Sequence, residues 1–112
     1  LWRMVEEAAA AAGDRVWRLP AYPDYRVLLR SLVADVRNSG YGEAGTILAG
    51  MFIEEFTEGR PWVHLDIAAS HWNENLLLTT IPRGPTGAAC RLLVHLAALI
   101  GRRTNLAAGT LG

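Results

Sequence analysis

The segment Trp62-Val63-His64-Leu65-Asp66-Ile67-Ala68 alternates apolar and polar side chains without becoming wholly apolar. This pattern predicts a β-strand that lies near a sheet edge or leads into a site. Upstream, Val16-Trp17-Arg18-Leu19 has β-branched and aromatic character and predicts a second, short strand. Helical patterns flank both segments, and strands that alternate with helices indicate an α/β unit.

Four helices are expected around these strands. The first, rich in Ala and Glu, covers residues 1–12 and should end at Gly13. The second covers residues 25–33, the third 46–57 and the last, opened by Gly84-Pro85-Thr86-Gly87, residues 88–100. The glycine-dense residues 39–45 predict a loop. In the last helix the apolar residues predicted to face the core, or alternatively an intersubunit seam, are Leu92, Leu93, Leu96 and Ile100.

Length and composition limit what the chain can be. With 112 residues, 51% of them hydrophobic, it is one domain at most and should fold. Eleven basic and eleven acidic residues cancel, which argues against nucleic acid or an anionic membrane as a partner. Cys90 has no partner for an internal disulfide and is expected to be a small buried hydrophobe in a reducing cytosol.

The lack of a long apolar run and the residues at the start of the sequence predict a soluble, unexported chain. No run approaches the roughly 18 apolar residues that a membrane helix needs, and acidic Glu6 and Glu7 stand where a signal peptide would be apolar. The sequence opens at Leu1 inside a helical pattern, which we interpret as the start of a fragment. Its hydrophobic content then predicts self-association.

Taken in order, a set of short blocks resembles the leucyl aminopeptidase (cytosol aminopeptidase) family. One block alone would be common by chance, but the ordered set over nearly the whole chain is not. The blocks are Val16–Pro20, Tyr25, Ser31, Ala34–Asn38, Ala44–Ile47, Phe52, Glu55-Phe56, Pro61–Ala68, Trp72 and Gly84–Gly87.

The resemblance implies a cytoplasmic aminopeptidase that uses two divalent metal ions, zinc or manganese, to remove N-terminal residues from peptides. It implies that residues 1–112 are the C-terminal portion of a leucyl-aminopeptidase-type catalytic domain. The expected fold class is therefore α/β, a fragment of a mixed sheet flanked by helices and forming a single partial domain. Family members are hexamers, which implies a homo-oligomer.

The family's metal ligands and its catalytic lysine and arginine lie upstream of the matched region, around an N-T-D-A-E-G-R segment that has no counterpart here. No metal ligand or catalytic residue is therefore assigned, and the 112-residue chain alone is expected to bind no metal and to be inactive. The only nearby candidates are His64 and Asp66, which would share one face of a strand, but two ligands do not make a zinc site. Asp66, Ser70 and His71 form a catalytic triad in composition only.

By resemblance, three positions contribute to the wall of the first subsite, which receives the N-terminal side chain of the substrate. They are Ser39, Ala68 and His71, and the first and last are polar where the family usually has apolar residues. A buried polar group costs free energy unless it finds a partner, so a leucine preference is in doubt. Alternatively, His71 turns to solvent or bonds to Asn73 or Glu74. Ala69 replaces a family glycine and would be strained if the backbone there has positive φ.

Three functions remain open at this point. The leading hypothesis is an aminopeptidase of which this chain is the downstream part. The alternative is a non-catalytic, stand-alone remnant that acts as an oligomeric scaffold or interaction module. DNA binding, known for some relatives, is disfavoured by the zero net charge.

Overall fold

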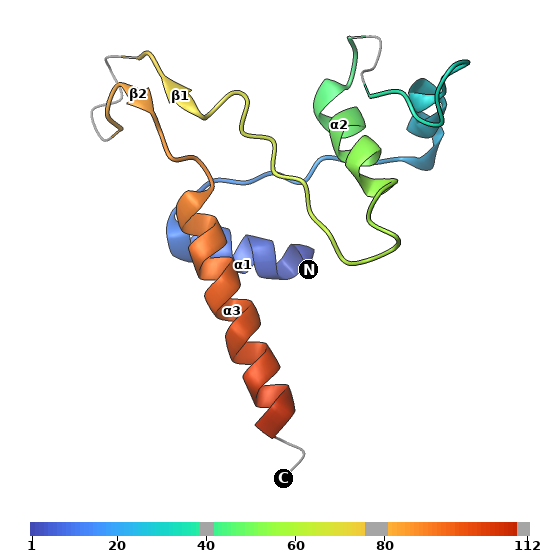
Figure 1. Ribbon diagram of the computed structural model, residues 1–112. Coiled ribbons are helices and arrows are strands. Elements are labelled where there is room, and N and C mark those ends of the chain that lie inside the picture. The colour runs from blue at the N-terminus through green and yellow to red at the C-terminus, as the bar shows by residue number, and fades with distance from the viewer. Residues whose placement is uncertain (39–41, 76–80, 110–112) are drawn as a thin grey trace. The chain divides into compact units, whose positions relative to one another are not determined.

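The computed structural model describes residues 1–38, 42–75 and 81–109, with residues 105–109 described through their backbone alone (Figure 1). The elements are α1 (Trp2–Ala12), the 3-10 helix η1 (Pro23–Leu29), α2 (Gly45–Glu54), β1 (Trp72–Asn73), β2 (Gly84–Pro85) and α3 (Cys90–Gly109). The chain forms two compact units, Leu1–Val16 with Leu65–Gly112 and the intervening Trp17–His64.

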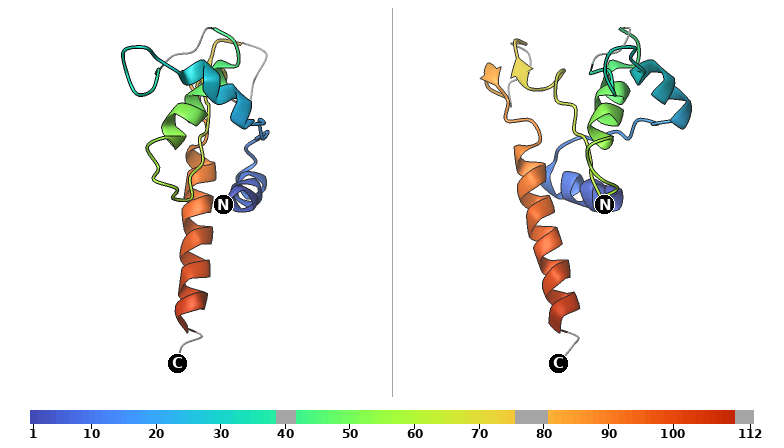
Figure 2. Two further views of the ribbon diagram at one scale, coloured as in Figure 1. Left: turned by 90° about the vertical axis from the view of Figure 1, so that its right-hand side faces the viewer. Right: turned by 45° about the vertical axis from the view of Figure 1, so that its right-hand side comes forward.

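In the first unit, α1 packs against α3 (Figure 2). Alanines and Val5 recur along one face of α1 at helical spacing and are buried, and their small size lets the helices approach closely. On α3, the buried residues follow the same periodicity. The buried residues on the two helices are Val5, Ala8, Ala9 and Ala12, and Leu92, Leu96 and Leu99.

As predicted, α1 ends at Gly13, whose φ of 71° lies in the left-handed region. The N–H of Gly13 donates to the Ala10 carbonyl at 3.3 Å, and the N–H of Asp14 donates to the Ala9 carbonyl at 3.0 Å. These bonds satisfy carbonyls that the helix end would otherwise leave unpaired. Asp14 is thereby placed directly beside the start of α3.

The Asp14 carboxylate links the end of α1 to the start of α3. Its Oδ2 accepts the backbone N–H of Leu92 at 3.1 Å, and its Oδ1 accepts the Arg91 guanidinium at 2.9 Å. An acidic group at a helix N-terminus pairs with an orphan N–H and with the positive end of the helix dipole. Because the Arg91 side chain is 72% exposed and that of Asp14 only 18%, the backbone contact contributes more than the ion pair.

We expect Asp14→Ala to lower the free energy of unfolding by about 1–2 kcal/mol, since a half-buried N–H loses a charged acceptor. Urea unfolding of the 112-residue chain, followed by circular dichroism, measures the change. Glu6→Ala, an exposed acidic site on α1, is the control and should change the midpoint little. Equal midpoints for the two variants would show that Asp14 does not link the helices.

In the second unit, η1 packs on α2. The buried centre is Leu29, Leu48 and Met51. At the edge of the unit, Arg26 forms ion pairs with Glu54, at 2.6 Å, and with Glu55. The helix expected over residues 25–33 forms as a 3-10 helix that ends at Leu29 and does not reach residue 33. Its end follows from Ser31, whose hydroxyl accepts the N–H groups of the two residues at 33 and 34 and so competes with helical bonding.

The two expected strands do not form within the described residues. Residues 16–19 and 61–67 belong to no ladder, and the one two-stranded sheet there is antiparallel, with Trp72 opposite Pro85 and Asn73 opposite Gly84. A strand exists only when a neighbour completes its hydrogen bonds, so the right sequence pattern is not sufficient. The structure is thus a small, helix-rich α/β arrangement with a short hairpin.

Candidate substrate-binding site

The residues before β1 form a tight turn that positions His71. The Asp66 carboxylate accepts the N–H of Ala68 at 2.8 Å and so starts the turn. The carbonyl of Ile67 then accepts two N–H groups, from Ser70 at 2.9 Å and from His71 at 2.8 Å. The chain therefore folds back on itself immediately before the hairpin.

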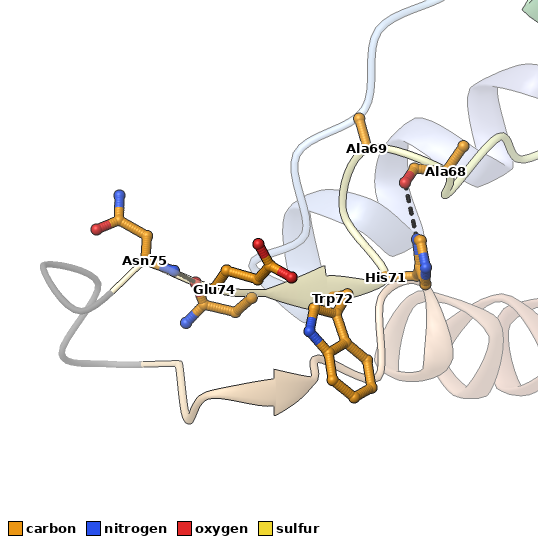
Figure 3. Close-up of a pocket in the computed structure, with 7 residues that line it drawn as sticks. Ala68, Ala69, His71, Trp72, Glu74 and Asn75 are labelled. Atoms are coloured by element: carbon orange, nitrogen blue, oxygen red, sulfur yellow. Dashed lines mark hydrogen bonds between the residues drawn. The ribbon is translucent and has the colours of Figure 1, made fainter.

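The imidazole of His71 is fixed by this turn. Its Nδ1 lies 2.7 Å from the carbonyl oxygen of Ala68 (Figure 3). A carbonyl oxygen only accepts, so Nδ1 carries the proton and donates, which leaves Nε2 as the acceptor of the neutral ring. Ala68 and His71, both predicted as site residues, are thus brought together. The ring is also exposed to solvent, as one form of the alternative had it, and its hydrogen bond is to Ala68, not to Asn73 or Glu74.

Thr86, the residue that follows β2, stabilises this turn through two hydrogen bonds. The N–H of Thr86 donates to the carbonyl of His71 at 2.9 Å, and its hydroxyl donates to the carbonyl of Ser70. Asn73 is the one buried polar residue of the described chain, at 6% exposure. Its amide donates to the carbonyl of Ile81 at 2.9 Å and its oxygen accepts the N–H of Asn75 at 2.9 Å. The sequence named Asn73 only as a possible partner of His71 and Thr86 only within the block Gly84–Gly87. Neither was predicted as a site residue, because neither carries a reactive group.

A shallow, open depression lies along the turn and β1 (Figure 3). The indole of Trp72 is 52% exposed and offers a flat apolar surface, while Glu74 adds a carboxylate. Such a mixture can hold one side chain of a ligand through apolar contact and hydrogen bonds. The residues that line it are Ala68, Ala69, His71, Trp72, Asn73, Glu74 and Asn75.

The other predicted positions have different outcomes. Ser39 lies outside the described residues. Ala69, which stands where the family has glycine, does not have positive φ. Its backbone is therefore not strained in the way that a positive φ would cause. Ser70 donates to the Ile67 carbonyl at 3.3 Å and His71 bonds to the Ala68 carbonyl, so each of these triad candidates binds backbone.

The described residues do not fit a metal centre. Within residues 1–38, 42–75 and 81–109, no group of three or more His, Cys, Asp or Glu side chains is placed to hold an ion. Asp66 bonds instead to the N–H of Ala68. Nor, in that part of the chain, is any helix long and apolar enough to cross a membrane.

The sequence of the chain is similar to those of a class of peptidases. Residues 1–94 match the model of the "Cytosol aminopeptidase family, catalytic domain". A probable cytosol aminopeptidase of Alkaliphilus metalliredigens is 44% identical over 98 residues, covering 87% of this chain and 19% of the relative. One from Clostridium perfringens is 44% identical over 93 residues, covering 83% and 19%.

Two solved structures agree in fold. The bottromycin maturation enzyme BotP in complex with Mn is similar with a TM-score of 0.80 and 40% identity, over 88% of this chain and 22% of that one. A tomato leucine aminopeptidase variant is similar with a TM-score of 0.73 and 34% identity, over 85% and 18%. The chain belongs to the cytosol aminopeptidase family. It spans about a fifth of the length of the curated relatives that it matches.

Proposed function

We propose that this chain is part of a metal-dependent aminopeptidase that releases N-terminal amino acids from peptides. Residues 1–112 would form the C-terminal portion of its catalytic domain, and the enzyme would act in the cytoplasm. The observation that carries the proposal is the match of residues 1–94 to the catalytic-domain model, supported by relatives that share 44% identity.

The complete enzyme would use two divalent metal ions, zinc or manganese. Bound ions would polarise the scissile carbonyl and activate a water molecule. Manganese in the complex of the similar enzyme BotP supports this choice. Since the described residues of this chain contain no suitable cluster, the ligands would come from elsewhere in the enzyme, and this chain would contribute to substrate binding.

Ser39, Ala68 and His71 would contribute to the wall of the first subsite. The hydrogen bond between His71 Nδ1 and the Ala68 carbonyl supports the pairing of two of them, because it holds the ring in one orientation and leaves Nε2 for a ligand. A neutral ring accepts a hydrogen bond from a polar substrate side chain, and a protonated ring attracts a carboxylate. We therefore propose a preference shifted from leucine toward polar or acidic N-terminal residues.

This role predicts a change of specificity in the complete enzyme. Replacing His71 by alanine should raise kcat/KM for a leucyl substrate relative to a glutaminyl substrate, whose amide N–H can donate to Nε2, by about tenfold, the scale of pocket contacts worth about 1–3 kcal/mol.

Paired assays of the parent and the variant with leucyl and glutaminyl p-nitroanilides at one fixed pH measure the ratio of the two kcat/KM values. The control is His95→Ala, since His95 is an exposed histidine on α3 away from the turn. If His71→Ala and His95→Ala both give the parent's ratio, the imidazole of His71 does not contact substrate.

The complete enzyme would also complete the sheet and assemble as a homo-oligomer, a hexamer as in the family. Residues 62–68 keep the alternation of a strand, and a neighbouring strand from the rest of the domain would turn this segment into part of a mixed sheet. Exposed apolar side chains support further contacts, among them Leu32 at 104% and Val33 at 96% exposure.

The alternative is a non-catalytic remnant that serves as an oligomeric scaffold. The absence of a metal cluster from the described residues is what favours it. The intact mass of the natural gene product separates the two functions. A mass near 12.2 kDa supports the remnant, whereas a several-fold larger mass supports the enzyme.

A further inference from the structure

Helix α3 has a second apolar face, which α1 does not cover. Leu92, Leu96 and Leu99 recur at helical spacing and are buried, and the residues half a turn away from them are apolar or small as well. We call these residues the outer face of α3. They are Cys90, Leu93, Val94, Ala97, Ile100 and Gly101, and all of them are exposed.

The exposure of this face is large for a soluble protein. Val94 is 70% exposed, Leu93 50% and Ile100 42%. Prediction from the sequence placed Leu93 and Ile100 in the core, and Cys90 as a buried residue, and the structure contradicts all three. The reason is geometric: α1 is a single helix and covers one side of α3, whereas the apolar residues of α3 extend around most of its circumference. A contiguous exposed apolar face of this kind is typical of an interaction surface.

Charges along the border of the outer face restrict its occupant. Arg91, His95 and Arg102 lie along one side of it, and residues 90–109 include no Asp or Glu. In an antiparallel pair of two copies centred between Leu96 and Ala97, near the middle of the outer face, Arg91 of one copy would lie beside Arg102 of the other. Such like-charge contacts oppose pairing of the face with itself and favour a partner with acidic residues at its border.

The family match indicates what that partner is. Cys90, Leu93 and Val94 lie inside the matched residues 1–94, and the matched relatives are about five times as long as the region that they share with this chain. An aminopeptidase thus supplies much additional protein surface to which this helix can pack. Small residues at Ala97 and Gly101 would let another helix approach closely.

We propose that the outer face of α3 is the docking surface for the remaining part of a cytosol aminopeptidase catalytic domain, which meets it with an apolar surface bordered by acidic side chains. The contact forms even when that part is a separate polypeptide. This inference rests on the proposed function for the identity of the partner, but the docking itself requires no catalysis.

The experiment mixes the 112-residue chain with the Alkaliphilus metalliredigens relative truncated to lack the 98 residues that match this chain. Size-exclusion chromatography with light scattering detects a one-to-one complex. Alkylation of the single Cys90, read by the mass of this chain, reports whether the outer face is covered. We expect a complex in which alkylation of Cys90 slows by about tenfold or more, since a covered thiol is inaccessible to reagent.

Two matched variants test the surface. Ala97→Glu places a carboxylate on the outer face, and Ala10→Glu makes the same change at an exposed alanine of α1. We expect Ala97→Glu to abolish both the complex and the protection of Cys90, and Ala10→Glu to preserve both. Charge reversal by Arg102→Glu should weaken the complex. If the truncated relative is insoluble alone, co-expression replaces mixing, and its recovery in the soluble fraction with each variant is the measurement.

Several results would overturn the docking surface. They are the absence of a complex between two soluble partners, a complex in which Cys90 reacts at its free rate, and loss of the complex with Ala10→Glu as well as Ala97→Glu. Protection of Cys90 from alkylation in the chain alone would also overturn the proposed docking surface. If that protection grew with concentration it would identify a second copy as the occupant, and if it did not it would identify the chain's own residues. A complex that protects Cys90 but hydrolyses no peptide would leave the docking intact and contradict the proposed function.

Discussion

The isolated 112-residue chain is expected to release no amino acid from leucine-p-nitroanilide, with or without added zinc or manganese. A two-metal peptidase needs ligands that hold both ions, and the described residues offer no cluster of three or more ionisable ligands. Because the uncatalysed reaction is slower than enzymatic hydrolysis by about 10⁶-fold or more, this is the largest effect predicted for the protein.

The assay requires protein freed from host peptidases. A preparation made in parallel from cells without the chain serves as the control for contamination. Metal-dependent hydrolysis that follows the chain through two chromatographic steps, and that is absent from the control, would show that the chain carries a metal site of its own.

Leu92→Ala should destabilise the α1–α3 pair by about 2–5 kcal/mol, because it removes a buried side chain and leaves a cavity that the helices fill only in part. Leu92 is 1% exposed and lies in the first turn of α3, on the side that packs against α1. Against a total stability of about 5–15 kcal/mol for an ordinary domain, such a loss is enough to unfold a small unit.

The neighbouring Leu93→Ala is a matched control for this substitution. Leu93 is 50% exposed and faces away from α1, so we expect a loss of less than about 1 kcal/mol. Urea unfolding of the two variants beside the parent measures both values. A similar loss for the two would mean that α3 presents a different face to α1 than the structure shows.

Features set by local chemistry could be predicted from the sequence. The end of α1 at Gly13 is one, because only a residue that accepts positive φ closes the helix there. Ala68 and His71 were singled out only by resemblance to the family. The turn that brings them together, which Asp66 starts by accepting the N–H of Ala68, was not predicted.

Features that depend on a partner could not be predicted. Residues 61–67 have the alternation of a strand but no ladder, since hydrogen bonding between strands is a property of two segments and not of one. Leu93 was assigned to the core because hydrophobic periodicity does not tell which side of an all-apolar helix is covered. Asn73 was missed because its burial follows from hydrogen bonds with the carbonyl of Ile81, eight residues away.

The proposed enzyme function is tested most directly by the aminopeptidase activity of the complete natural gene product. The protein is purified at its natural length, stripped of metal with a chelator, and assayed on aminoacyl p-nitroanilides before and after manganese is restored. We expect negligible release from the stripped protein and recovery of activity with manganese, from a product several times heavier than 12.2 kDa. A natural product of about 12.2 kDa, or a longer one that stays inactive with both manganese and zinc, would contradict the assignment.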